Sequence, residues 1–241
     1  MTDYLLVHGA WQGAWGWERV VQLLQERGHR AVALDLPGHG SRAHEDLSKI
    51  RLQNYVEAVI AEIEGKNMKD VVLVGHSLAG ITLPYVALRL PERIKRLVFI
   101  SCMVPDEGKR VVDMLSPVDR LLYRLIVGLG GARQRGAKLP RFIARWKFCN
   151  DMDRATANQV LNGMTPEPVG PWEEPISRRG LENLKIGMTY VLLTRDRAIP
   201  PERQRRMAHN LGEPELVELE AGHNAPISRP RELVEVLLRY A

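Results

Sequence analysis

Short apolar runs recur along this chain and alternate with segments in which apolar residues return every three or four positions. Runs of four to six residues favour buried β-strands, and the wider spacing is typical of amphipathic helices. The pattern predicts six strands, and because helical segments stand between them, it predicts a mainly parallel sheet flanked by helices. The strands are expected at residues 4–7, 31–35, 71–74, 96–101, 189–194 and 215–219.

The clearest helical spacing lies at residues 17–24, 56–63 and 233–240, and Gly28 and Gly65 are the stop signals of the first two. We expect these apolar stripes to face the core rather than a functional site. Residues 105–186 break the alternation, with a glycine-rich segment at 128–131 and a proline-rich run at 166–175.

The segment that follows the strand predicted at 71–74 has the most specific pattern in the chain. Residues 75–80 read Gly-His-Ser-Leu-Ala-Gly and open an apolar helical stretch. This pattern is typical of a nucleophile elbow, a strained strand-to-helix turn that exposes the Oγ of a serine. Ala79 replaces the last glycine of Gly-x-Ser-x-Gly and is still small. The alternative is an ordinary turn in which Ser77 only caps the helix.

A serine hydroxyl needs a base to become a nucleophile, and the base needs an acid that orients it. In folds with this elbow, the three groups follow in the order Ser, Asp or Glu, His, each after a strand. Asp196 follows the strand at 189–194, and His223 follows the strand at 215–219. We therefore predict a triad of Ser77, Asp196 and His223.

Two further residues compete for these roles. Asp106 lies just beyond the strand predicted at 96–101 and is the rival for the acid. His209 falls in a basic helical stretch, so we expect it on the solvated surface rather than at the site.

The first predicted strand, 4–7, breaks into a loop that begins with His8, Gly9 and Ala10. Acyl transfer builds negative charge on a carbonyl oxygen, and backbone N–H groups stabilise that charge. We expect the two donors of this oxyanion hole to be the N–H groups of Ala10 and Leu78, the residue after the serine. In isolation, a plain turn would be the favoured explanation of this loop, and the oxyanion-hole interpretation depends on the other features and their order.

Four segments together resemble the α/β-hydrolase superfamily: residues 6–15, 28–36, 72–80 and 221–223. Within it, they are similar to the branch that holds the plant methyl-ester esterases, the related hydroxynitrile lyases and many bacterial serine esterases. The similarity is strong in residues 4–105 and 189–240 and weak between them. The resemblance implies an α/β-hydrolase fold and a catalytic apparatus, and it says little about the substrate.

The resemblance also implies that the insertion at 105–186 is a helical cap that roofs the active site, on a core formed by residues 1–104 and 187–241. Such a cap would form the pocket and exclude water. The candidate pocket residues are Gly9, Trp11, His76, Trp146, Phe148 and Trp172.

Three functions from different classes follow from these residues. The first is a serine hydrolase that cleaves a small to medium, apolar or aromatic carboxylic ester through an acyl-enzyme. The others are a hydroxynitrile lyase and a ligand sensor on the same fold. The lyases of this branch carry threonine at the place of Gly9, an acidic residue at His76 and lysine at Asn224. Gly9 and His76 match the esterases instead, and Asn224 matches neither well, so the residues favour the esterase.

The composition agrees with a soluble enzyme of one domain: 241 residues, of which 45% are hydrophobic and 26% charged. No apolar stretch approaches the ~20 residues that span a membrane. The first strand begins by Tyr4, which leaves no room for a leader, so we expect a cytoplasmic protein. The sequence leaves a homodimer open as an option.

Neither a metal nor a cofactor is expected. The two cysteines, Cys102 and Cys149, match no zinc spacing, and no Gly-x-Gly-x-x-Gly follows a strand. The net charge of +5 is too small to indicate nucleic acid as a partner.

Residues 120–147 nevertheless hold eight basic residues and no acidic one. This stretch is either the solvated face of the cap or an entrance that attracts anions, with a membrane-surface contact as the third option. Its basic residues are Arg120, Arg124, Arg133, Arg135, Lys138, Arg141, Arg145 and Lys147.

Overall fold

The computed structural model of the chain describes residues 1–128 and 136–241. Within them, six strands form one sheet in the order β2-β1-β3-β4-β5-β6, and each neighbouring pair is parallel. The predicted fold class, a six-stranded parallel sheet flanked by helices, is confirmed. The strands are β1 Asp3–Val7, β2 Arg30–Leu34, β3 Val71–His76, β4 Ile94–Ile100, β5 Gly187–Leu193 and β6 Glu215–Leu219.

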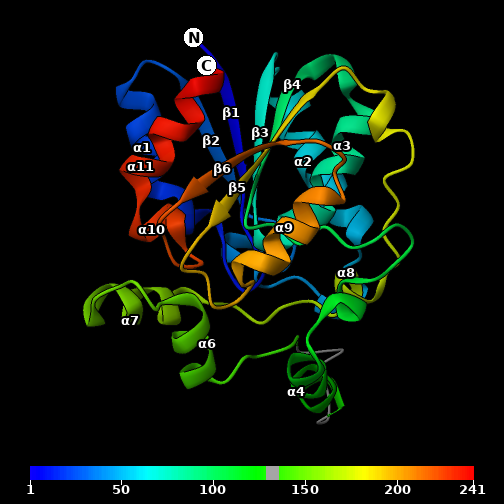
Figure 1. Cartoon of the computed structure of the whole chain (residues 1–241), viewed down its shortest axis with the longest axis vertical. Helices are drawn as coiled ribbons and strands as arrows, with labels where there is room; N and C mark the ends of the chain where they lie inside the picture. The colour runs from blue at the N-terminus through cyan, green and yellow to red at the C-terminus, as the bar shows by residue number, and fades with distance from the viewer. Residues whose placement is uncertain (129–135) are drawn as a thin grey trace.

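Helices cover both faces of the sheet (Figure 1). Because successive side chains of a strand point to opposite faces, Leu5 and Leu73 pack toward α2, α3 and α9, whereas Leu6 and Val72 pack toward α1 and α11. Both faces are therefore apolar, as buried parallel strands require. These helices are α1 Glu18–Glu26, α2 Leu52–Gly65, α3 Leu83–Arg89, α9 Pro201–His209, α10 Ala225–Ser228 and α11 Pro230–Leu237.

Short 3-10 helices connect many of these elements and contribute single turns beside the sheet. They are η1 Ala14–Trp17, η2 Gly40–Arg42, η3 Leu47–Lys49, η4 Ser77–Ile81, η5 Pro91–Arg93, η6 Val111–Met114, η7 Leu181–Asn183 and η8 Leu238–Tyr240.

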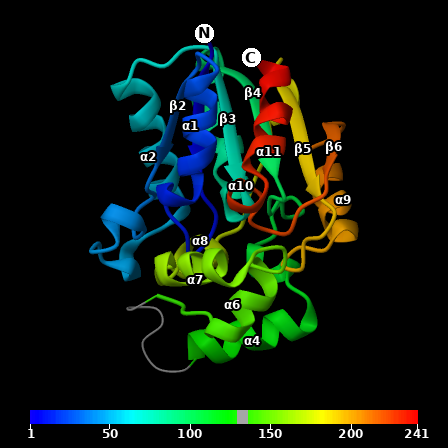
Figure 2. The same ribbon diagram turned by 90° about the vertical axis from the view of Figure 1, so that its left-hand side faces the viewer.

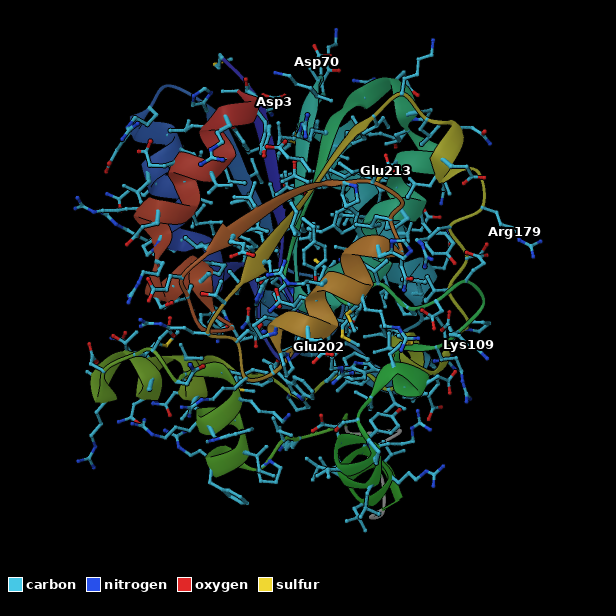
Figure 3. The ribbon with its side chains drawn as sticks, in the orientation of Figure 1. Asp3, Asp70, Lys109, Arg179, Glu202 and Glu213 are labelled. Atoms are coloured by element: carbon cyan, nitrogen blue, oxygen red, sulfur yellow. The ribbon has the colours of Figure 1, made fainter. Side chains whose placement is uncertain are left out.

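The chain between β4 and β5 contains four described helices, and we call residues 105–186 the cap segment. Figures 1 and 2 show α4, α6 and α7 at the end of the molecule opposite the two termini. Asp3 and Asp70 mark the end near the termini, and Glu202, at the start of α9, marks the end of the core beside the cap (Figure 3). The helices are α4 Pro117–Gly128, α6 Arg141–Phe148, α7 Arg154–Gly163 and α8 Gly170–Glu173.

Of the glycine-rich segment expected at 128–131, only Gly128 belongs to the described residues, and Arg133 and Arg135 also lie outside them. None of the helices in the described residues combines the length and the apolar character needed to cross a membrane.

Candidate active site

Ser77 stands at the sharp turn where β3 ends and η4 begins. Its φ of 53° is in the left-handed region, which costs ~1–2 kcal/mol for an L-residue, so its surroundings must hold it there. The N–H of Met103 donates to the Ser77 carbonyl at 2.8 Å. A side chain at Gly75 would meet Leu83 at 2.7 Å, so glycine lets the helix pack close to the strand. The turn has the shape that the sequence pattern predicted.

The structure brings His223 and Asp196 to this serine. His223 Nε2 lies 3.0 Å from Ser77 Oγ, and His223 Nδ1 lies 2.7 Å from Asp196 Oδ2. The acid lies in the loop after β5 and the histidine in the loop after β6. Because parallel strands end at the same edge of a sheet, residues 146 positions apart in sequence meet in one hydrogen-bonded chain.

Asp196 is buried and its carboxylate accepts several hydrogen bonds. Oδ1 accepts from the N–H groups of Ala198 and Ile199 at 2.7 and 2.9 Å, and Oδ2 accepts from Ser101 Oγ at 2.6 Å. Burial alone would raise the pKa of Asp196, but the charge of His223 and these hydrogen bonds outweigh it, so the pKa is lowered. The carboxylate is therefore charged at neutral pH and fixed in place.

The ring of His223 is packed between two aromatic rings. The centroid of the His76 ring lies 4.7 Å away and that of Phe148, from the cap segment, 5.2 Å away. His76 Nε2 also donates to the His223 carbonyl at 2.8 Å. Burial and the charge of His223 lower the pKa of His76 to about 3, so His76 is neutral. It supports the base from behind.

The rival acid lies elsewhere. Asp106 Oδ2 accepts from Arg206 at 2.8 Å, and Asp106 Oδ1 accepts from Asn210 at 2.9 Å, on the surface beside α9. His209 is exposed, as the sequence suggested. The geometry therefore favours Asp196 over Asp106 as the partner of the histidine.

The loop after β1 passes directly over the elbow. An added Cβ at Gly9 would lie 2.7 Å from Ser77 Cβ, so only glycine permits this approach. Ala10 and Leu78 line one cavity together with Ser77 and His223. Both residues predicted for the oxyanion hole therefore lie at the same cavity as the serine.

A buried histidine fixes the peptide before Ala10. His8 Nε2 accepts from the N–H of Leu36 at 3.0 Å, and His8 Nδ1 therefore carries the proton that it donates to the Gly9 carbonyl at 2.8 Å. Burial, with the charge of His39, lowers the pKa of His8 to about 3, which keeps this neutral tautomer.

The cavity above Ser77 is open to solvent on one side, and its wall is mostly apolar. One charged pair belongs to this wall: Lys147 Nζ lies 2.9 Å from Asp119 Oδ1 and so links α6 to α4. The remaining wall suits apolar or aromatic groups, and includes Leu115, Leu122, Ile126, Leu139, Val169 and Ile199.

Three of the six expected pocket residues line this cavity, namely Trp11, Phe148 and Trp172. Trp146 is a correction, because its side chain is 55% exposed and lies outside the cavity. It precedes Phe148 by two positions, which on a helix turns it by about 200°, so only one of the two can face inward.

Gly9 and His76 are also corrected. Gly9, in the loop after β1, backs onto Ser77, and the His76 ring contacts His223, so neither forms the cavity wall. Both contact the candidate catalytic residues rather than the cavity.

Glu167, which was not among the predicted site residues, lies in the cap segment, is buried and belongs to the cavity wall. The sequence signal that could have identified Glu167 is its place between Pro166 and Pro168. An acidic residue in a rigid, largely apolar run needs a hydrogen-bond or charge partner if it is buried. Asn224 was weighed only against the lyases. It is buried and bridges Gln12 and the Phe148 carbonyl, so it ties the loops after β1 and β6 to the end of α6.

The described part of the basic stretch is mostly on the surface. Arg124, Lys138, Arg141 and Arg145 are exposed, and only Lys147 reaches the cavity wall. Among the described residues, no group of three or more His, Cys, Asp or Glu side chains is placed to hold a metal ion.

Comparisons with known proteins agree with this geometry. The model of the alpha/beta hydrolase family matches residues 4–236. Salicylic acid-binding protein 2 of Nicotiana tabacum is 29% identical, with 99% of this chain and 96% of that protein covered. The carbendazim hydrolyzing esterase of Nocardioides sp. is 28% identical, with 98% of each covered.

Among solved structures, an extracellular alpha/beta-hydrolase from a Paenibacillus species superposes with a TM-score of 0.91 at 25% identity, covering 100% of this chain and 99% of that one. This bacterial hydrolase is described as sharing structural and functional homology with the same tobacco protein. The chain belongs to the alpha/beta hydrolase family, in the branch of the plant methylesterases and their bacterial relatives.

Proposed function

We propose that this protein is a cofactor-independent serine esterase that cleaves small to medium apolar or aromatic carboxylic esters through an acyl-enzyme. The chain is an enzyme of the carboxylesterase type, since its relatives include named esterases. The observation that carries the mechanism is the hydrogen-bonded chain from Asp196 through His223 to Ser77, which opens into an apolar cavity.

In the first half-reaction, Ser77 Oγ bonds to the ester carbonyl carbon while its proton passes to His223 Nε2. The protonated histidine then gives this proton to the leaving alcohol as the C–O bond breaks. Asp196 stabilises the positive ring and holds its tautomer, and its lowered pKa keeps it charged for that purpose.

In the second half-reaction, His223 takes a proton from water, and the water oxygen attacks the acyl carbon. The collapse of this second intermediate breaks the bond to Ser77 and returns the proton to its Oγ. In both halves, the carbonyl oxygen becomes negative, and the N–H groups of Ala10 and Leu78 stabilise it.

The wall of the cavity supports the choice of substrate. Most of its groups are aliphatic or aromatic, and its lysine is already paired with Asp119, so a neutral apolar ester leaves no charge unpaired. In this proposal, residues 1–104 and 187–241 supply the catalytic groups, and the cap at 105–186 supplies much of the wall.

The lyase has less support. The place of Gly9 has no room for a threonine side chain, because even its Cβ would lie 2.7 Å from Ser77 Cβ. Asn224 stands where the lyases have lysine, and its amide is held by Gln12 and Phe148 rather than facing the cavity. The assembled triad also disfavours a pure sensor.

The test is a panel of p-nitrophenyl and aryl methyl esters with the wild type and Ser77→Ala. We expect wild-type hydrolysis and a fall in kcat of about 10³ or more in the variant. Mass spectrometry of a slow ester should find the acyl group on Ser77. Full activity in Ser77→Ala would refute the proposal, and release of cyanide from mandelonitrile without ester hydrolysis would favour the lyase.

A further inference from the structure

Glu167 is a buried carboxylate with an unusual set of partners. Its side chain is 1% exposed, and such a group costs several kcal/mol unless its oxygens accept hydrogen bonds. Oε2 accepts from the backbone N–H of Trp11 at 2.8 Å and from His39 Nε2 at 2.9 Å. Oε1 accepts from Trp172 Nε1 at 3.2 Å and from the Tyr55 hydroxyl at 3.4 Å. Both oxygens are satisfied.

His39 is the buried side-chain partner of the Glu167 carboxylate. Burial would raise the pKa of Glu167, but the charge and hydrogen bond of His39 and the bonds from Trp11 and Trp172 outweigh it and lower that pKa. The other ring nitrogen of His39 lies 3.1 Å from the Pro37 carbonyl oxygen, so the ring is held on both sides.

Trp11 follows Ala10 directly and has a φ of 61°, in the left-handed region. A tryptophan there is strained, and such strain persists only where the surroundings fix it. The cap segment holds this residue at three atoms: its N–H donates to Glu167, its carbonyl accepts from the N–H of Thr165 at 3.0 Å, and its indole N–H donates to the Ala137 carbonyl at 2.9 Å.

These contacts bear on the direction of one N–H group. The N–H of Ala10 belongs to the planar peptide whose carbonyl, on Gly9, accepts from His8. The next peptide carries the N–H of Trp11, which Glu167 holds. The two peptides that flank Ala10 are thus fixed from opposite sides, one by the core and one by the cap.

We propose that Glu167 is a positioning residue for the oxyanion hole: by holding the N–H of Trp11, this residue of the cap aims the N–H of Ala10 at the carbonyl oxygen of the substrate. This inference rests on the proposed esterase function. Glu167 itself exchanges no proton with the substrate, and its contribution acts through the backbone of the loop.

The chain offers a matched control in Glu174. It is also a glutamate of the cap segment that accepts a backbone N–H of the core, that of Leu52 at 3.4 Å. Leu52 begins α2 and belongs to no catalytic loop. Removing the Glu174 side chain therefore measures how a hydrogen bond between cap and core affects stability, without any effect on the loop after β1.

The first experiment measures kcat and KM for a neutral aryl ester in Glu167→Ala, Glu167→Gln and Glu174→Ala. Loss of an oxyanion donor costs about 10²–10³ in kcat. A misaimed donor should cost less, so we expect about a ten- to hundredfold lower kcat in Glu167→Ala with KM within about threefold. Glu167→Gln keeps an oxygen acceptor for Trp11 and should recover most of the rate. Glu174→Ala should keep the wild-type kcat.

The second experiment measures binding rather than turnover. An aryl trifluoromethyl ketone accepts Ser77 Oγ at its carbonyl carbon, the serine proton passes to His223, and the ketone oxygen becomes an oxyanion. The matching secondary alcohol fills the cavity without an oxyanion. In Glu167→Ala, affinity for the ketone should fall by about the same factor as kcat, while affinity for the alcohol stays within about threefold.

The outcomes separate the two proposals. A folded Glu167→Ala with wild-type kcat and ketone affinity overturns the positioning role. So does an equal loss for ketone and alcohol that Glu167→Gln does not repair, since that result marks Glu167 as structural. If Ser77→Ala retains activity, the esterase mechanism itself fails, whatever Glu167 does.

Discussion

The core and the cap segment bring their groups to the site in different ways. In the core, Ser77, Asp196 and His223 each follow a strand, and the parallel sheet collects them at one edge. In the cap, Glu167 lies in an irregular run and meets Trp11, 156 positions away in sequence. The regular sheet thus assembles the proposed catalytic groups, and a less regular segment completes their surroundings.

The two regions also differ on their outer surfaces. Apart from Met1 and Leu216, the exposed large apolar side chains of the described residues lie on α4 and α6 of the cap. α4 has apolar residues on two sides, since Leu122 and Ile126 line the cavity and others face outward. The core buries almost all of its large apolar side chains, whereas the cap leaves several exposed. The outward set is Val118, Leu121, Leu125, Phe142 and Trp146.

The largest expected effect tests the core. Asp196→Asn should lower kcat by about 10³–10⁴, because an amide favours the wrong tautomer of His223. Asp106→Asn should change kcat by less than about threefold, because Asp106 contacts Arg206 and Asn210 instead. Steady-state kinetics on one aryl ester decides between them. A near-normal rate in Asp196→Asn with a large loss in Asp106→Asn would reverse the assignment of the acid.

A smaller effect should come from the cap, and α4 provides two neighbouring leucines to measure it. Leu122→Trp narrows the cavity and should lower the ratio of kcat/KM for long or aromatic acyl esters to that for acetate by about tenfold or more. Leu121→Trp adds the same bulk on the exposed side and should leave the ratio unchanged.

The comparison of the two leucine variants also needs melting temperatures, since overpacking lowers stability. Equal losses on every ester in Leu122→Trp, with a lower Tm, would mean that this face of α4 packs the fold and does not select substrates. A change of preference in Leu121→Trp would mean that substrates also contact the outer face of the cap.

The smallest effect should follow chelation. The proposed chemistry uses side chains and backbone N–H groups of this chain, so dialysis against a chelator should leave the rate unchanged. A serine-directed phosphonylating reagent should instead add its mass at Ser77 and stop turnover. Activity that falls on chelation and returns with an added divalent cation would contradict this prediction.

The core was predictable because its signals are local. A strand, a tight turn with small residues and a helix are adjacent in sequence at Ser77, and the order of Asp196 and His223 after later strands follows from the fold. The place of Gly9 after the first strand predicted a loop at the site, but the sequence did not predict the close contact of Gly9 with Ser77.

The cap was less predictable for physical reasons. The aromatic content of residues 146–148 did not give the rotation of their helix, so Trp146 was wrongly placed in the pocket, whereas Phe148 lines the cavity. Glu167 could not be assigned because its partners come from distant parts of the chain. Packing of an irregular segment depends on contacts that no spacing in the sequence encodes.

The tie between Glu167 and Trp11 limits how far this protein is modular. Chimaeras that exchange caps between relatives treat the cap as a replaceable part that only alters specificity. A donor cap without a carboxylate at this place would leave the Trp11 N–H, in its left-handed turn, without that acceptor. Recombination at residues 105 and 186 must therefore transfer the loop after β1 together with the cap.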